Sequence, residues 1–128
     1  MIYKSNVLDR FTKYRFILVE GLHTGECIDR SQVVKICETV DLRYNVCCLF
    51  VSESIISSPL HVISAVEHAA RSYLQSGRDL KVEISLYLVG STQISEALNT
   101  VIPGCLSDFC VLILSTDRNS ALNAFEAV

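Results

Sequence analysis

Several features are scarce in this chain of 128 residues, and each scarcity excludes a class of protein. Two Pro and five Gly are too few for a collagen-like or Pro-rich chain. No apolar run approaches the roughly 20 residues that a membrane-spanning helix needs. Polar residues interrupt the N-terminal segment 1–6, where a secretory leader would carry an apolar run. We therefore expect a cytoplasmic protein without membrane contact.

Excess charge of either sign is also lacking. Eleven basic and fourteen acidic residues give a net charge of −3, which argues against a strongly basic domain that clamps nucleic acid and leaves room for a local basic patch. Half of the residues are hydrophobic, so intrinsic disorder is excluded. The length suits one domain, which we expect to span residues 1–128.

Sequence motifs for catalysis are missing too. The five glycines never take the spacing of a dinucleotide-binding or phosphate-binding loop, and no serine lies in a Gly-x-Ser-x-Gly elbow. Glu83 and Glu96 lie on different expected elements, so they form no acid–base pair. We expect no enzyme and no cofactor. A small enzyme or redox protein that uses Cys and His, and a homodimeric structural module, stay open as alternatives.

The six cysteines favour neither a metal site nor a disulfide framework. They contain no Cys-x-x-Cys pair, and the gap from Cys105 to Cys110 does not match common zinc-ligand spacings. Cys47 and Cys48 are neighbours on an expected strand and face opposite sides of it. Without a secretory context, we expect most of the cysteines to be reduced, buried, small hydrophobic residues and expect no metal.

Hydrophobic periodicity predicts alternating strands and helices. Apolar runs and strict alternation indicate strands, whereas apolar residues spaced three and four apart indicate helices. The expected strands cover residues 16–19, 45–51, 81–89 and 109–114, and the expected helices cover 31–41, 60–76, 92–101 and 119–128. This order fits a parallel or an antiparallel sheet, and periodicity alone does not choose between them.

The helix expected at 60–76 has the clearest signals. Ser58 is suited to cap it, Pro59 to open it and Gly77 to end it. Ile63, Val66, Ala70, Tyr73 and Leu74 should face the core. The opposite face should carry His61, Ser64, His68, Arg71 and Gln75. This polar face is either an ordinary solvated surface or, together with Arg78 and Lys81, a cationic ridge for phosphates and unpaired bases.

The helix expected at 92–101 allows two interpretations. The spacing of Ile94, Ala97, Leu98 and Val101 suits a face packed on the core, with Gln93 exposed in the first turn. Alternatively, Gln93 and the small Ala97 belong to a flat surface on which another protein docks.

Three ordered segments resemble the small subunits of the KEOPS/EKC complex that are related to TPRKB, the PRPK-binding protein. Residues 58–69, SPLHVISAVEHA, resemble a family helix with the pattern hydrophobic-His-Leu-x-x-A-x-x-x-A. Residues 82–88, VEISLYL, are similar to a family strand that begins Leu-Glu-hydrophobic. Residues 90–98, GSTQISEAL, are similar to the family signature G-x-R-Q-I-x-x-A-hydrophobic, with Thr92 where archaeal members usually have Arg.

The resemblance implies an α+β domain whose mostly antiparallel sheet is covered by helices. It implies a non-catalytic accessory subunit, cytoplasmic and in eukaryotes also nuclear, that binds the small PRPK-type kinase/ATPase. Through the complex it would support the threonylcarbamoyl-adenosine (t6A) modification of tRNA, with indirect contact to the threonylcarbamoyl transferase and direct contact to the 3′ CCA end of tRNA. The residues expected to bind the kinase are Gln93, Ile94, Ala97 and Leu98. Those expected to bind tRNA are His61, His68, Arg71, Arg78 and Lys81.

Overall fold

A computed structural model describes all residues, 1–128, and contains four strands and six α-helices. No helix in it has the length and apolarity that crossing a membrane requires. In chain order the elements are β1 (Ile2–Lys4), α1 (Asn6–Phe11), β2 (Phe16–Asp29), α2 (Arg30–Tyr44), β3 (Cys47–Ser52), a 3₁₀ turn η1 (Glu53–Ile55), α3 (Pro59–Ser76), α4 (Leu80–Val89), α5 (Ile94–Val101), β4 (Cys105–Ser115) and α6 (Arg118–Ala127).

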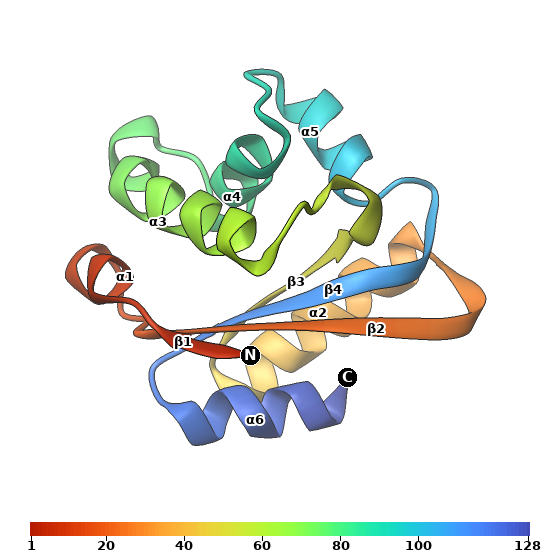
Figure 1. Cartoon of the computed structure of the whole chain (residues 1–128), viewed down its shortest axis with the longest axis horizontal. Coiled ribbons are helices and arrows are strands. Elements are labelled where there is room, and N and C mark those ends of the chain that lie inside the picture. The colour runs from red at the N-terminus through yellow and green to blue at the C-terminus, as the bar shows by residue number, and fades with distance from the viewer.

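The four strands form one antiparallel sheet in the order β1-β2-β4-β3, with helices on both faces (Figure 1). Helices α1, α3, α4 and α5 lie over one face, and α2 and α6 cover the other. The expected α+β class with an antiparallel sheet is therefore confirmed.

Alternation along the strands produces two cores. In β3, Cys47, Leu49 and Val51 pack towards α3, while Cys48 and Phe50 pack towards α2 and α6. Successive side chains of a strand point to opposite faces, so a strand buried on both faces is apolar throughout. This is why the central apolar runs of the sequence mark strands correctly.

Helix α3 matches its prediction closely at both ends. The Ser58 hydroxyl accepts a hydrogen bond from the backbone N–H of His61, Pro59 opens the first turn, and Gly77 ends the helix in the left-handed conformation at φ +73°. Ile63, Val66 and Ala70 are buried as expected. Leu74, expected in the core, is 69% exposed, because no other element packs on that side of the last turn of α3.

The segment expected to be a strand at 81–89 is instead helix α4. Leu80, Ile84 and Leu88 recur every four residues and are buried, and Leu86 is buried on another side of the same helix. A helix that packs between neighbours on several sides becomes apolar almost all round, so its amphipathic period disappears. The alternation of apolar residues was therefore misleading, although Asp79 as N-cap and Gly90 as left-handed C-cap mark the helix ends.

Other elements begin or end at residues different from those predicted. Strand β2 continues from the predicted apolar run through a polar stretch to Asp29, because pairing with β4 supports it. His23, expected in a loop, consequently lies on this strand. Asp29, rather than Ser31, caps α2, accepting a hydrogen bond from the backbone N–H of Gln32 at 2.9 Å.

Helix α2 contacts the start of β3 at its outer edge. Asp41 on α2 accepts a hydrogen bond from the backbone N–H of Cys48 through its side chain, at 2.6 Å, and one from that of Val46 through its carbonyl, at 3.4 Å. Edge strands normally expose such groups as a template for pairing with another chain. Here Asp41 occupies the N–H of Cys48 in β3 and that of Val46, the residue before the strand.

The cysteines largely follow the prediction, with one correction. Cys37, Cys47 and Cys48 are free and buried, and Cys110 is free and half-buried. Cys27 and Cys105 form a disulfide, which the sequence argument disfavoured. They lie 78 positions apart, and only the antiparallel pairing of β2 with β4, which places Asp29 opposite Cys105, brings them together.

Candidate functional site

Helix α5 presents two apolar side chains to solvent. Ile94 and Leu98 lie one turn apart on its outer face and are 41% and 40% exposed. Ala97 and Val101 lie on the inner face and are buried. Gln93, at the N-cap position, is exposed.

This placement changes which residues can contact a partner. The expectation that all four apolar residues face the core is half right, because a short helix at the rim of the fold packs through one narrow face only. Ala97 has no exposed surface and cannot touch another protein directly. Ile94 and Leu98, together with Gln93, form the accessible part of the predicted kinase-binding set.

A groove of about 770 Å³ runs beside α5, between α2 and α4. Leu98 on one wall and Val34 on the other are both about two-fifths exposed, and Cys37 and Leu49 lie between them. Apolar surface on α5 therefore continues into a hollow of the size that binding sites commonly have.

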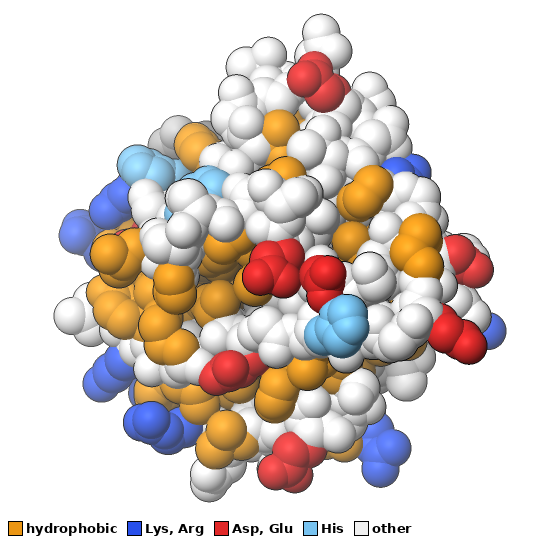
Figure 2. Space-filling view, turned by 45° about the vertical axis from the view of Figure 1, so that its right-hand side comes forward, with side chains coloured by type: hydrophobic (Ala, Val, Ile, Leu, Met, Phe, Trp, Pro, Cys, Tyr) orange, Lys and Arg blue, Asp and Glu red, His pale blue; other side chains and the backbone are white.

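The residues of the predicted cationic ridge do not form one surface. Lys81 is directed into the groove, where its Nζ lies 2.6 Å from Oδ2 of Asp41 on α2. The guanidinium of Arg78 lies 2.9 Å from Oε1 of Glu83 on α4. Two of the three expected cations are thus paired with carboxylates. In Figure 2, Lys and Arg side chains are likewise scattered around the edge of the visible face and do not gather into a basic patch.

The carboxylate of Glu83 is buried and belongs to the packing of α3 on α4. It accepts hydrogen bonds from the Ser72 hydroxyl at 2.7 Å and from Arg78. Burial raises the pKa of Glu83, but the hydrogen bonds from Arg78 and Ser72 outweigh it, so the net pKa lies below the ordinary value. Arg78, whose side chain is 42% exposed, therefore compensates the buried charge of Glu83 from the protein surface.

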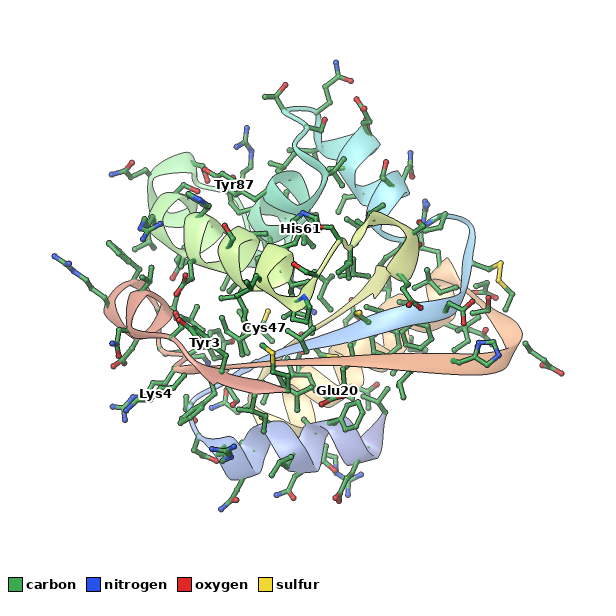
Figure 3. The ribbon with its side chains drawn as sticks, in the orientation of Figure 1. Tyr3, Lys4, Glu20, Cys47, His61 and Tyr87 are labelled. Carbon is green, nitrogen blue, oxygen red and sulfur yellow. A yellow bond between two sulfur atoms is a disulfide. The ribbon has the colours of Figure 1, made fainter.

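His61 also has a structural position. Its Nδ1 accepts a hydrogen bond from the backbone N–H of Ser57, and its Nε2 lies 3.1 Å from the carbonyl oxygen of Leu88. These bonds tie the start of α3 to the end of α4, with the proton on Nε2. The ring lies between the helices, as Figure 3 shows, and both nitrogens are occupied.

A smaller polar surface remains around His68. Its ring stacks on Tyr87 of α4, with ring centroids 5.6 Å apart and planes 20° apart. Arg71, one turn further along α3, is exposed and takes part in no ion pair. An exposed aromatic pair beside a free guanidinium can stack on a base and contact a phosphate. Sequence reasoning missed Tyr87 because the strand assignment placed it away from His68.

One histidine–carboxylate pair bears on the alternative of an enzyme. Nδ1 of His23 contacts Asp108 across β2 and β4, the orientation that a catalytic dyad requires. Both side chains are more than half exposed, and no hydroxyl or thiol is hydrogen-bonded to the second nitrogen. No group of three potential ligands is placed to hold a metal ion.

Comparison of the chain with protein-family profiles, with curated proteins and with solved structures finds no match in any of the three. The local geometry and the sequence resemblance are therefore the basis for a functional proposal.

Proposed function

We propose that this protein is a non-catalytic accessory subunit of the KEOPS/EKC type. It docks on a PRPK-type kinase/ATPase, binds the 3′ CCA end of tRNA and supports t6A modification in the cytoplasm, and also in the nucleus if the source is eukaryotic. The resemblance of residues 58–98 to TPRKB-like subunits motivates the proposal. The antiparallel α+β fold agrees with what that resemblance implies.

The exposed pair Ile94 and Leu98 is the observation that best supports docking. Large aliphatic side chains on adjacent turns, beside an apolar groove, are what a partner helix or loop can bury. Gln93 lies at the start of the same helix and can provide a polar contact at the rim. Ala97 contributes indirectly, because its small size lets α5 pack closely on the core.

The docking test is a pull-down with the cognate PRPK-type kinase. Ile94→Asp and Leu98→Asp should each strongly reduce co-purification, since each places a charge in the buried centre of the interface. Leu122→Asp is a matched control, because Leu122 is 42% exposed on α6, on the other face of the sheet. Retention of the kinase by the double variant of α5 would remove this helix from the interface.

For tRNA, the geometry favours His68, Arg71 and Tyr87 over the wider predicted set. Arg78 and Lys81 are committed to Glu83 and Asp41, and His61 to backbone groups. We expect Arg78, Lys81 and His61 to support tRNA binding indirectly, by holding α3 and α4 in place.

The tRNA test compares binding curves over a range of salt concentrations. Arg71→Gln should weaken binding and reduce the salt slope by about 0.7 per lost phosphate contact to a single strand. Tyr87→Ala should weaken binding to tRNA with an intact CCA end more than to tRNA lacking it. Arg118→Gln, on α6, is the control. Equal curves for Arg71→Gln and Arg118→Gln would eliminate this surface as the tRNA site.

The alternatives give different results. A homodimeric module would show a doubled mass by light scattering and no tRNA shift in a gel. A small enzyme based on His23 would lose a measurable turnover with His23→Gln and keep normal kinase binding.

A further inference from the structure

The segment that leads out of α5 is held at one corner of the molecule. Cys105, the first residue of β4, is joined by the disulfide to Cys27 of β2, with Cα atoms 5.5 Å apart. Arg30, at the start of α2, holds the same segment through its side chain, whose Nε donates to the carbonyl oxygen of Ile102 at 2.9 Å. The backbone N–H of Arg30 also donates to the carbonyl of Gly104 at 3.1 Å. The disulfide is the one covalent bond among these contacts.

Helix α5 has little local support of its own and ends next to this anchored segment. It has eight residues and no side-chain hydrogen bond at its N-cap. Ala97 and Val101 are its only buried side chains. Helices this short are marginal without tertiary support, so their position is set by a few packed residues and by the segments at their ends.

The disulfide is accessible from solvent. Cys27 and Cys105 are both exposed, in contrast to the buried thiols of Cys37, Cys47 and Cys48. Cys27 also lies in the stretch between His23 and Ile28 where the register of β2 against β4 shifts. Regular pairing with β4 is therefore interrupted at Cys27, and exposed disulfides are those most open to thiol exchange.

We propose that the Cys27–Cys105 disulfide is a redox-sensitive clamp on α5, opened by a dithiol reductant. A thiolate of the reductant attacks one sulfur, the bond between the two cysteines breaks, and the other cysteine leaves as a thiolate that takes up a proton. The second thiol of the reductant then resolves the mixed disulfide. Two electrons pass to the protein, both cysteines end as thiols, and the reductant ends as a disulfide.

Opening the clamp removes the covalent link and leaves three weaker holds: the hydrogen bonds of Arg30, the packing of Ile102 and the pairing of the start of β4 with β2. Helix α5 then samples open positions more often, and the exposed pair Ile94 and Leu98 loses its fixed geometry. An effect of reduction on kinase binding rests on the proposed function. The clamp itself does not depend on that function.

The test is hydrogen–deuterium exchange of the full chain, oxidised and after treatment with dithiothreitol. Amides of α5 and of residues 102–104 should exchange about tenfold faster in the reduced protein, since local opening becomes easier. Amides of α3 serve as the internal reference and should change less. The double variant Cys27→Ser/Cys105→Ser should behave like the reduced protein and gain nothing further from dithiothreitol. Cys110→Ser, which removes a free thiol, should behave like the oxidised protein.

Three outcomes overturn the clamp: unchanged exchange in α5 on reduction, acceleration that is equal in α3 and α5, or free Cys27 and Cys105 thiols in the untreated protein by mass spectrometry after alkylation. Kinase co-purification is measured separately on the same samples. Faster exchange of α5 on reduction, with unchanged kinase binding, supports the clamp and counts against the docking role of α5. Loss of kinase binding in Ile94→Asp, with no effect of reduction on exchange, supports the docking role and overturns the clamp.

Discussion

Helices α3 and α5 lie in the same layer but differ in length, in capping and in the number of side chains that they bury. Helix α3 has 18 residues, a serine N-cap, a glycine C-cap and six buried side chains. Helix α5 has eight residues, no side-chain cap and two buried side chains. The hydrogen bonds of Ser72 and His61 fasten α3 to α4, whereas α5 is held at its C-cap, Ile102, by the side chain of Arg30.

The difference separates a structural element from one suited to binding. Binding surfaces are often taken from the less stable parts of a fold, because apolar residues that contact a partner cannot also be buried in the core. Ile94 and Leu98 are unavailable to stabilise α5 for that reason. The following substitutions test this contrast, from the largest expected effect to the smallest.

Truncating one isoleucine on each helix gives the sharpest contrast. Ile63→Ala on α3 should lower the free energy of unfolding by about 2–5 kcal/mol, because Ile63 is 4% exposed and its loss leaves a cavity. Ile94→Ala should change it by no more than about 0.5 kcal/mol. Urea denaturation measures both. Similar losses in the two variants would show that Ile94 is part of the core.

Removing the charge of Glu83 tests the link between α3 and α4. Glu83→Gln should cost about 1–3 kcal/mol at neutral pH, because one of the two acceptor oxygens becomes an NH2 donor and the bond that remains is no longer to a charged group. The pKa of Glu83 is lowered in the folded protein, so this stabilisation is present above the ordinary value of 4.5 and is lost as the pH falls through the folded value.

Unfolding free energies of the wild type and Glu83→Gln should therefore converge as the pH falls below 4.5, the ordinary pKa of a glutamate. The control is Glu96→Gln, because Glu96 is exposed on α5. Parallel curves for wild type and Glu83→Gln would contradict the assignment of the acid-sensitive contact to Glu83.

The N-cap of α3 has a smaller effect. Ser58→Ala removes the hydrogen bond to the N–H of His61 and should cost about 1 kcal/mol in thermal or urea unfolding. Ser64→Ala, in the exposed middle of the same helix, should be neutral or slightly stabilising, since alanine is the better helix former. Equal effects would mean that Ser58 contributes no cap.

Adding a cap to α5 should give the smallest effect. Gln93→Asp places a short acceptor where none exists and should stabilise α5 by about 0.5–1 kcal/mol. Slower amide exchange confined to α5 is the measurement. Gln93→Glu carries the same charge on a longer side chain that caps poorly, so it should stabilise α5 less than Gln93→Asp. A larger effect of Gln93→Glu would mean that the charge, and not a capping hydrogen bond, stabilises the helix.

The sequence predicted best those elements whose signals are local. The caps and apolar face of α3 lie within one segment, and the apolar runs of β3 and β4 are buried on both faces. The strand prediction for α4 is wrong because neighbouring elements bury this helix on several sides. Its apolar residues then fit the two-residue period of a strand as well as the spacing of a helix.

The candidate sites were predicted in part, for the same reason. Local spacing identified α5 but did not reveal that Ala97 points inward while Ile94 points outward. The partners of Arg78 and Lys81 depend on how the helices pack, and Asp41 lies 40 positions from Lys81. The disulfide likewise depends on the long-range register of two strands.

The Asp41 contacts at the margin of β3 have a consequence for behaviour at high concentration. Because the N–H of Cys48 is already bonded to Asp41, a strand from another copy has no free donor at that position of β3. Replacing Asp41 by alanine would free this N–H for another copy to bind and so favour association at that margin.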